Sequence, residues 1–342
     1  MPSPFGGGES EPASAVRTRH PRGKGIGSAD GQRSCRSGDH TSTTGGPTVT
    51  AHKILGPLLV VVIAACGGTE ASSAMSGVPA AAETAGPERI VSISTVATEM
   101  LFAIDAGHRV VAVDSMSNYP AEAPTTDLSG YQPNVEAILG FAPDLVVLSY
   151  DPGDVMAGLE AAGVATLLQG AAYTLADTYD QITALGAITG DVDEAAALVA
   201  DMQSEMADLA ASVQERDEPL SYYHELDDTL YTVTSSTFIG EVYALAGLVN
   251  TADAADPDGA SWGYPQLSAE YLLDADPDLI FLADTRCCSQ TAVTVAERPG
   301  WETLTAVING TVVELDDDVA SRWGPRIVDL LRVIVDSVNA IS

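Results

Sequence analysis

The chain has 342 residues, 46% of them hydrophobic, which is enough for two domains with apolar cores. From residue 66 onward it contains eight arginines, no lysine and 44 acidic residues, a net charge of −36. This balance argues against a nucleic-acid partner and against contact with an anionic membrane through a basic patch. We interpret the acidic residues as a solvated protein surface suited to an extracellular medium of high salt concentration.

The N-terminal part of the chain is predicted to be a targeting segment. Residues 1–53 are rich in Gly, Ser, Thr and Pro, and we expect them to be disordered or to precede the true start. Residues 54–66 contain a twelve-residue apolar run, too short to span a bilayer but typical of a signal-peptide core. The run ends in Ile63-Ala64-Ala65-Cys66-Gly67, which resembles the bacterial lipobox and implies acylation of Cys66. The alternative is an ordinary signal peptide with an incidental cysteine. Residues 67–87 are predicted to be a flexible tether.

Residues 88–176 are predicted to form a first α/β lobe. The predicted strands are 89–94, 110–113, 145–148 and 164–168, and the predicted helices are 96–104 and 154–162. This alternation predicts a parallel sheet with helices on both faces, and ligands beyond the carboxyl ends of its strands. Those ends carry Ser94, Thr95, Asn118, Tyr119, Tyr150 and Asp151, and either Ser94 or Thr95 is expected to cap the following helix.

Residues 177–217 are predicted to form linking helices. The first runs from about Asp177 to Thr189, and the second from Asp191 to Arg216. Apolar residues in the second recur in steps of three and four, so one stripe faces a partner. Asp191 and Glu194 predict a box-like cap, and Pro219 is expected to end the helix. At 1.5 Å per residue it is roughly 39 Å long, and we interpret it as a rigid strut between two lobes.

Residues 218–342 are predicted to form a second α/β lobe. Its predicted strands are 220–225, 279–282 and 311–315, and its predicted helices are 238–246 and 324–340, with helical turns at 294–297 and 301–304. A polar turn is expected at 232–237 and an acidic loop at 250–263. One unit occurs on both sides of the strut: Glu136 and Glu270 each precede a Pro-Asp pair by seven residues, and a hydrophobic strand follows. The repetition predicts two similar lobes.

Two adjacent cysteines, Cys287 and Cys288, follow the strand predicted at 279–282. Exposed thiols rarely stay reduced in an oxidising exterior, so we predict a vicinal disulfide that stiffens the wall of a pocket. The alternative is two reduced cysteines packed as small hydrophobic residues, because ring strain makes such a bond easier to reduce.

Several motifs together resemble a known family. They are residues 89–94 with 97–103, Asn118-Tyr119-Pro120, both glutamate units, Thr237-Phe238-Ile239-Gly240-Glu241, Arg298-Pro299-Gly300-Trp301 and Gly324-Pro325-Arg326. Over residues 88–342 the chain resembles the cobalamin and ferric-siderophore class of substrate-binding lipoproteins of ABC importers. The resemblance implies two Rossmann-like α/β lobes bridged by one long rigid helix, with a ligand cleft between the lobes.

The resemblance also implies that Glu136 and Glu270 dock onto arginines of a permease dimer, where charged rims set register and on-rate. The alternative is that both are solvated glutamates at helix starts, favoured there by the helix dipole.

A large planar ligand requires aromatic walls and a few polar groups. The candidate ligand-binding residues are Tyr119, Tyr150, Phe238, Trp262, Tyr264, Trp323, Arg286, Asp318 and Arg322. The resemblance places Tyr119, Phe238, Tyr264 and Asp318 at or near ligand-contacting positions, whereas core packing is the alternative for each aromatic residue. Arg286 and Arg322 are expected either to be paired or to hold an anionic group of the ligand.

The sequence contains no enzyme signature. After residue 53 only His108 and His224 remain, too few for a three-histidine metal site, and His224 is interpreted as a hydrogen-bonded structural residue. We therefore expect no metal site and no cofactor, because the ligand itself carries Fe or Co. The predicted partners of this monomeric, membrane-anchored extracytoplasmic protein are an ABC permease dimer and a metal chelate. Cobalamin, siderophore and haem remain open, and a surface thiol redox protein using Cys287-Cys288 is the alternative from another class.

Overall fold

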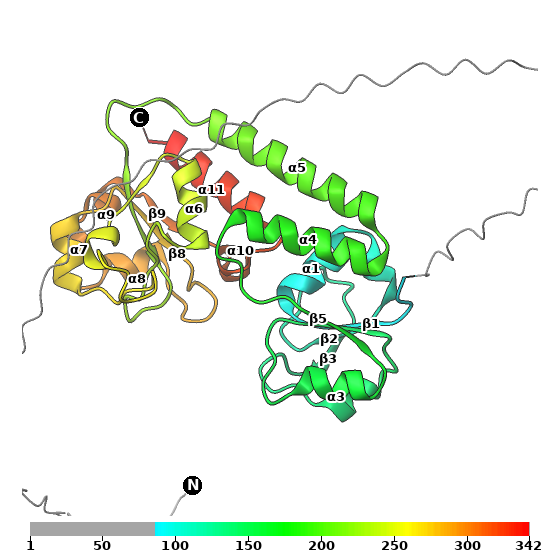
Figure 1. Cartoon of the computed structure of the whole chain (residues 1–342). Helices are drawn as coiled ribbons and strands as arrows, with labels where there is room; N and C mark the ends of the chain where they lie inside the picture. Colours follow the sequence, from blue (N-terminus) through cyan, green and yellow to red (C-terminus); the bar gives the residue numbers. More distant parts are fainter. Residues whose placement is uncertain (1–85, 342) are drawn as a thin grey trace, which may run out of the picture. The chain divides into compact units, whose positions relative to one another are not determined.

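The computed structural model describes residues 86–341. They lie in one compact unit, Ser76–Ser342, and contain two parallel β-sheets connected by helices (Figure 1). The predictions for residues 1–53, for the signal and lipobox with Cys66, and for nearly all of the tether lie outside the described residues.

The first sheet has five parallel strands in the order β3-β2-β1-β4-β5. The strands are β1 (Ile90–Ile93), β2 (Val110–Asp114), β3 (Thr125–Leu128), β4 (Leu145–Leu148) and β5 (Ala165–Leu168). Every residue of β1 and β4 is buried, which explains their uninterrupted runs of mostly apolar residues. The edge strand β3 was not predicted, because its Thr-Thr-Asp-Leu sequence carries little hydrophobic signal.

Helices cover both faces of this sheet. They are α1 (Thr95–Ala103), η1 (Ala106–Arg109), α2 (Val135–Leu139) and α3 (Val155–Ala161). The side chain of Ser94 accepts a hydrogen bond from the Ala97 amide, so Ser94 is the cap of α1. Alternate residues of β1 contribute to different cores: Ile90 packs in the cluster that contains α1, and Val91 packs in the cluster that contains α2 and α3. We call this sheet with its helices the first lobe.

Two helices follow, α4 (Leu175–Thr189) and α5 (Val192–Ala211), and α5 lies alongside α4 and the C-terminal helix α11 (Ile327–Asn339) (Figure 1). The predicted strut is therefore one unbroken helix of 20 residues. Its predicted bounds were too wide, because it ends at Ala211, well before Pro219. The Asp191 cap was also wrong, since this carboxylate forms an ion pair with Arg109 and makes no cap hydrogen bond.

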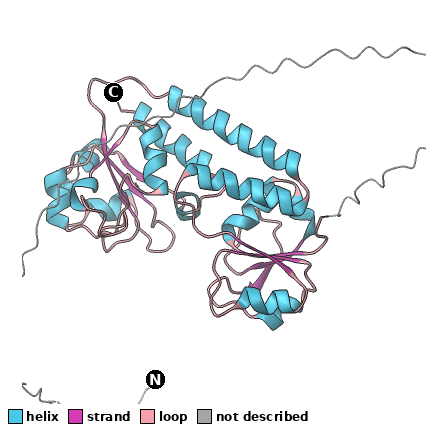
Figure 2. Ribbon diagram, viewed as in Figure 1, coloured by secondary structure: helices cyan, strands magenta, loops and turns pink. Residues whose placement is uncertain are grey.

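The second sheet has four parallel strands in the order β7-β6-β8-β9. They are β6 (Ser221–Glu225), β7 (Val249–Asn250), β8 (Leu279–Leu282) and β9 (Val312–Glu314), and Figure 2 shows them as a group separate from the first sheet. The two-residue strand β7 was not predicted, because it lies at the start of the acidic segment interpreted as a loop.

Short helices surround this second sheet and complete the second lobe. They are α6 (Phe238–Leu245), η2 (Asp253–Ala255), α7 (Ala269–Ala275), α8 (Ala292–Ala296), η3 (Trp301–Thr303), α9 (Thr305–Asn309), α10 (Asp317–Ser321) and α11. The sequence did not predict α9 and α10, which have five residues each and are too short for a clear period.

The repeated glutamate units build the same junction in each lobe. Asp144 accepts hydrogen bonds from the main-chain amides of Glu88 and Arg89, at the start of β1. Asp278 accepts from the amide and hydroxyl of Ser221, at the start of β6. In both lobes the Pro-Asp aspartate thus connects the strand it precedes to the first strand of its sheet, as the repetition predicted.

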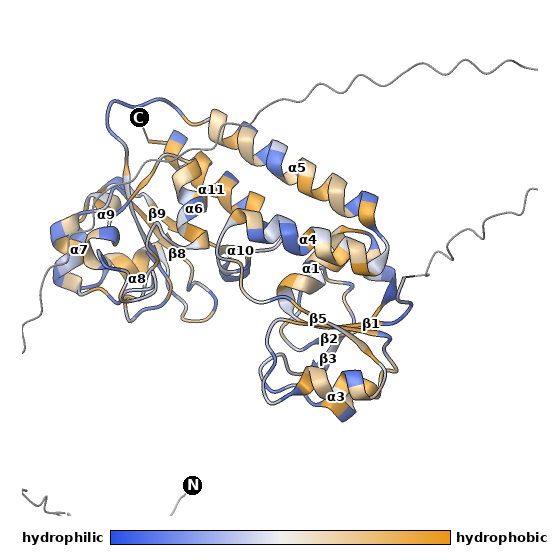
Figure 3. Cartoon of the chain, viewed as in Figure 1, coloured by the Kyte–Doolittle hydropathy of each residue, from blue (hydrophilic) through white to orange (hydrophobic). Residues whose placement is uncertain are grey.

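One continuous apolar core includes residues of both sheets together with α4, α5, α6 and α11. Figure 3 shows the corresponding apolar colouring along α11 and the strands, and mixed colouring along α5. The predicted fold class, two α/β lobes bridged by a long helix, is confirmed, although α4 and α11 pack beside the bridging helix.

Candidate functional site

A polar loop follows β2 in the first lobe. The Asp114 carboxylate accepts hydrogen bonds from the amides of Met116 and Ser117 at 2.7 and 3.1 Å and from the Ser117 hydroxyl at 3.0 Å. The Ser117 hydroxyl also lies 3.1 Å from the hydroxyl of Thr98 on α1. These bonds fix the main chain that presents Asn118 and Tyr119 at the carboxyl end of the strand.

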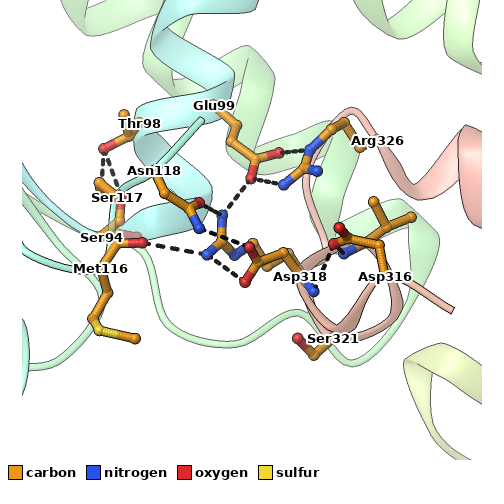
Figure 4. A network of polar contacts seen from close by, with 12 residues as sticks. Ser94, Thr98, Glu99, Met116, Ser117, Asn118, Asp316, Asp318, Ser321 and Arg326 are labelled. Carbon is orange, nitrogen blue, oxygen red and sulfur yellow. Dashed lines mark hydrogen bonds and ion pairs between the residues drawn. The ribbon is translucent and has the colours of Figure 1, made fainter. Parts of the chain in front are cut away.

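The two lobes meet at a network of polar contacts that we call the inter-lobe seam: Glu99, Asn118, Asp318, Arg322 and Arg326 (Figure 4). Arg322 donates to Glu99 and to the Asn118 side-chain oxygen, both at 2.9 Å. Arg326 donates to both oxygens of Glu99 at 2.6 and 2.9 Å. Asp318 accepts from Asn118 at 2.8 Å and from Arg322 at 2.7 Å.

The centre of the seam is nearly dry. The Glu99 side chain is 1% exposed and that of Arg322 is 9% exposed. A buried ion pair adds little net stability, but removal of one partner leaves an uncompensated charge and costs about 3–5 kcal/mol. The seam therefore holds the lobes in one arrangement. Arg322, predicted to contact ligand or to be paired, is paired.

Tyr119 connects the seam to the surface. The Arg326 guanidinium lies over its ring, 4.2 Å from the centroid, while 46% of the residue remains exposed. A cation on one face orients the ring and leaves the opposite face available for stacking.

The loop after β8 is fixed by Asp317. Its carboxylate accepts hydrogen bonds from the Thr285 hydroxyl and from the amides of Arg286 and Cys287, all between 2.8 and 3.0 Å. These bonds outweigh the opposing effect of burial and lower the pKa of Asp317. Arg286 also pairs with Asp318 at 2.9 Å, so the second arginine predicted near the ligand is engaged by the protein.

Cys287 and Cys288 are free thiols in this structure, the first exposed and the second half-buried. The vicinal disulfide predicted from the sequence is thus absent from it. Desolvation and a hydrogen bond with Cys288 raise the pKa of Cys287 to about 12. A thiol is a poor nucleophile at such a pKa, which argues against the alternative of a thiol redox protein.

The predicted aromatic residues divide into surface and core. Tyr119, Tyr150 and Tyr264 are between 45% and 57% exposed, and Trp262 is 89% exposed. Phe238 is 6% exposed and packs in the apolar core. Trp323 packs against the same core and donates its indole N–H to Gln181 at 3.1 Å. For Phe238 and Trp323 the structure therefore matches the core-packing alternative.

Trp262 is held in an unfavourable conformation. Its φ of 58° lies in the left-handed region, which a bulky residue rarely adopts. Asp256 holds the flanking chain by accepting hydrogen bonds from the amides of Ser261 at 2.9 Å and Gly263 at 3.3 Å. Backbone strain that presents an indole to solvent is typical of a binding position.

Tyr264 interacts with a tyrosine of the preceding segment that the sequence analysis did not single out. Its pKa is raised, first by burial and then by the charge of Tyr173. Tyr173 is 80% exposed and borders a hollow of ≈ 330 Å³ whose lining includes Gln169 and Asp177.

A second polar cluster is buried beneath the loop after β8. Arg298 forms two hydrogen bonds, 2.5 and 2.6 Å long, with the fully buried carboxylate of Glu225. Asp284 is also fully buried, and neither of its carboxylate oxygens has a hydrogen-bond partner within residues 86–341. Burial, followed by the charge of Glu225, raises the pKa of Asp284 to about 7.

His224 is a structural residue as predicted, since it is fully buried and its Nδ1 lies 2.8 Å from the Tyr243 hydroxyl.

Glu136 and Glu270 lie in the first turns of two matching helices, α2 and α7, and both are exposed. Each helix is capped in the same way: Asn134 accepts from the Ala137 amide, and Ser268 accepts from the Tyr271 amide. Their equivalent placement is compatible with docking and also with the alternative of solvated helix-start glutamates.

Within residues 86–341, no group of three or more His, Cys, Asp or Glu side chains is arranged to hold a metal ion. A helix with the length and apolarity needed to cross a bilayer is also absent from this described part of the chain.

Comparison with known proteins identifies the family. A family model described as periplasmic binding protein matches residues 90–319. The chain belongs to this family. It is 28% identical over 261 residues to an uncharacterized ABC transporter substrate-binding lipoprotein, YvrC, of Bacillus subtilis, which covers 74% of this chain and 80% of the relative. It is 32% identical over 252 residues to a cobalamin-binding protein of Halobacterium salinarum, which covers 71% and 67% of the two chains.

Solved structures agree with this assignment. The vitamin B12-binding protein BtuF of Vibrio cholerae superposes with a TM-score of 0.58 at 26% identity, over 74% of this chain and 97% of its own. The haem-binding protein HutB of the same species gives a TM-score of 0.64 at 22% identity, over 72% and 97%, a likeness of fold alone. These relatives are named as binding proteins, and the resemblance inferred from motifs is confirmed.

Two residues of the seam, Glu99 and Arg326, were not predicted as site residues, and neither was the exposed Tyr173. Glu99 and Arg326 lie within motifs that carried the family resemblance, so their positions were available. Their ion pair could not be predicted from the sequence, because the two residues are 227 residues apart in the chain.

Proposed function

We propose that this protein is the extracytoplasmic receptor of an ABC importer, and that it captures a metal-containing organic chelate and delivers it to the permease. The family match over residues 90–319 and the relatives named for substrate and cobalamin binding support this proposal. No resident cofactor is required, because the chelate itself carries the metal.

The observation that carries the proposal is the set of exposed aromatic residues in both lobes. Tyr119 lies at the seam against Arg326 of the other lobe, and Tyr173 and Tyr264 are 80% and 45% exposed. Trp262 presents an 89% exposed indole on a strained, braced loop. Large rings projecting from both lobes suit a planar ligand whose faces must be covered.

Replacement of Trp262 by alanine tests the binding role. We expect calorimetric titration with cyanocobalamin and with a ferric tris-hydroxamate to give a Kd at least about tenfold weaker for whichever chelate the wild-type protein binds, a loss of about 1.4 kcal/mol. Ile308→Ala is the matched control. Ile308 is also a large exposed apolar residue, 69% exposed, but it lies on α9, just before the amino end of β9 and so away from the carboxyl ends of the strands. Equal Kd values for wild type and Trp262→Ala would contradict the assignment.

We further propose that Glu136 and Glu270 dock onto the permease. Both are exposed and occupy equivalent helix starts, one in each lobe, so a two-fold symmetric partner can receive one carboxylate from each.

We also propose that Cys66 is acylated and anchors the protein to the cell membrane, as its lipobox-like context indicates. Cells fed an alkynyl fatty acid should label the wild-type protein, whereas Cys66→Ala should be unlabelled and released into the medium. Retention of Cys66→Ala in the membrane fraction would contradict the anchor.

A further inference from the structure

The arginines of the described chain are all engaged by the protein itself. Six of the eight in residues 86–341 pair with carboxylates, namely Arg109, Arg286, Arg298, Arg322, Arg326 and Arg332. The other two, Arg89 and Arg216, donate to main-chain carbonyl oxygens. The sequence has no lysine after residue 53, so no ammonium group is available either.

The charged side chains at the seam and on the adjoining α10 carry a net negative charge. The guanidinium groups of Arg286, Arg322 and Arg326 face the carboxylates of Glu99, Asp316 and Asp318. Asp317 adds a further carboxylate, and its lowered pKa keeps it ionised. Three cations therefore stand against four anions, within a chain whose net charge from residue 66 onward is −36.

An anionic ligand could recruit Arg322 or Arg326 only by taking them from their carboxylate partners, and it would meet the more exposed Arg286 beside Asp316 and Asp318. Release of Arg322 or Arg326 would leave Glu99, with a side chain 1% exposed, short of its counter-ions. The penalty for an unpaired buried charge is about 3–5 kcal/mol, which is larger than the gain from a typical new hydrogen bond to a charged group.

The exposed aromatic residues of the two lobes favour a different ligand. The surfaces of Tyr119, Tyr150, Tyr173, Trp262 and Tyr264 are π faces without formal charge. Such faces stack on neutral planar groups and attract cations through the ring quadrupole. They supply no cation to pair with the charge of a carboxylate or a catecholate.

We propose that the chelate carried by this receptor is uncharged or cationic, such as a corrinoid or a hydroxamate complex, and that anionic chelates are rejected. This inference rests on the proposed function, since it specifies the electrical class of the ligand of that same site.

A panel of four chelates tests the inference by calorimetric titration of the intact protein. Cyanocobalamin and a neutral ferric tris-hydroxamate represent the accepted class, and a ferric tris-catecholate and haemin represent the rejected class. We expect the tightest Kd within the accepted class, with less than about a twofold change between low and high salt because a neutral ligand is not screened. We expect anionic chelates to bind at least about a hundredfold more weakly.

The outcomes separate the inference from the function. Tightest binding of the catecholate or haemin would overturn the inference and leave the receptor function standing. Absence of binding to all four would overturn the proposed function, and the inference with it.

An isosteric substitution gives a second test. Asp318→Asn removes one carboxylate facing Arg286 and Arg322 but retains an acceptor for Asn118. We expect it to strengthen binding of the ferric tris-catecholate about tenfold or more relative to wild type, about 1.4 kcal/mol. Asp329→Asn makes the same charge change at the exposed Arg332 pair on α11 and should leave that affinity unchanged. Equal effects of the two variants, or no effect of either in proteins with native circular dichroism, would overturn the inference.

Discussion

Asp284 is a carboxyl group in surroundings very different from water. It is fully buried two residues after β8, and the groups that act on its charge are Glu225, Arg298, Tyr223 and Cys287. Arg298 gives two hydrogen bonds to Glu225 and none to Asp284, so its charge offsets only part of the effect of burial on Asp284. A carboxyl group in this position retains its proton to higher pH than usual.

This retention makes stability depend on pH. The folded pKa of Asp284 is about 7 against an ordinary value of 3.8, so between these values the folded state holds a proton that the unfolded state has released. Its contribution to stability is therefore complete below pH 3.8 and is lost as the pH rises toward 7.

We expect the Tm of Asp284→Asn minus the Tm of wild type to increase as the pH rises from about 5 to about 8, because the amide carries no ionisable proton. The measurement is thermal unfolding by circular dichroism of both proteins across that range. His224, whose burial lowers its pKa to about 3, acts in the opposite direction but is common to both proteins and cancels in the difference. Parallel Tm curves would contradict the prediction.

At this scale the sequence predicted residue types better than their partners. It singled out Arg286, Arg322 and Asp318, and the structure brings all three together. The sequence predicted that Asp191 caps a helix, whereas its carboxylate forms an ion pair with Arg109, which is far away in the chain. Local spacing carries information on caps, but a long-range ion pair leaves no period in the sequence.

At the scale of elements, α4 and α5 depend on one glycine for their close packing. A Cβ built on Gly186 of α4 would lie 2.4 Å from the Cβ of Ala195 and 2.8 Å from the main-chain oxygen of Asp191. Neither neighbour can move without displacing the turn between the two helices. Gly186 is therefore required where the linking helices approach each other.

Gly186→Ala should destabilise the protein by about 1–3 kcal/mol, because the overlap exceeds the gain in helix propensity from alanine. The matched control is Gly158→Ala in α3, where the added Cβ would lie 3.1 Å from a methyl group of the Val135 side chain. That side chain can move, so we expect no loss and a gain of up to about 1 kcal/mol. Chemical denaturation of the two variants measures the difference, and equal effects would show that the close approach is unimportant.

Element prediction succeeded where burial is complete. The strands β1, β4 and β8 are buried throughout, and their mostly apolar runs located them within one residue or two. The elements missed are β3, β7, α9, α10 and the short helices η1 and η2, which lie at sheet edges or have five residues or fewer. Their conformation is set by neighbours in the fold, which the local sequence does not record.

At the scale of the whole molecule, the repetition of one unit in both lobes is the feature with the clearest functional use. Both sheets share the pattern in which the first strand of the lobe lies between the second strand and the strand after the glutamate unit. A pseudo-symmetric receptor can address both subunits of a dimeric permease at once.

If the proposed docking is right, the double reversal Glu136→Lys with Glu270→Lys should abolish uptake of radiolabelled cyanocobalamin, or of whichever chelate the purified receptor binds, because like charges would then face arginines of the permease. The Kd of the purified variant for that chelate should remain within about twofold of wild type, since neither residue belongs to the seam. Glu160→Lys with Glu302→Lys reverses one exposed glutamate in each lobe as a control and should preserve uptake. Loss of affinity in the docking variant would assign the two glutamates to the ligand instead.

Glu99 limits how the receptor can report that it is loaded. Separation of the lobes would strip both guanidinium groups from a carboxylate that has almost no access to water. We therefore expect empty and occupied forms to keep nearly the same inter-lobe angle, which would leave a permease no large change of shape to sense. On that expectation, occupancy is detected at short range through the surface of the cargo, and the force that ejects the cargo originates in the transporter.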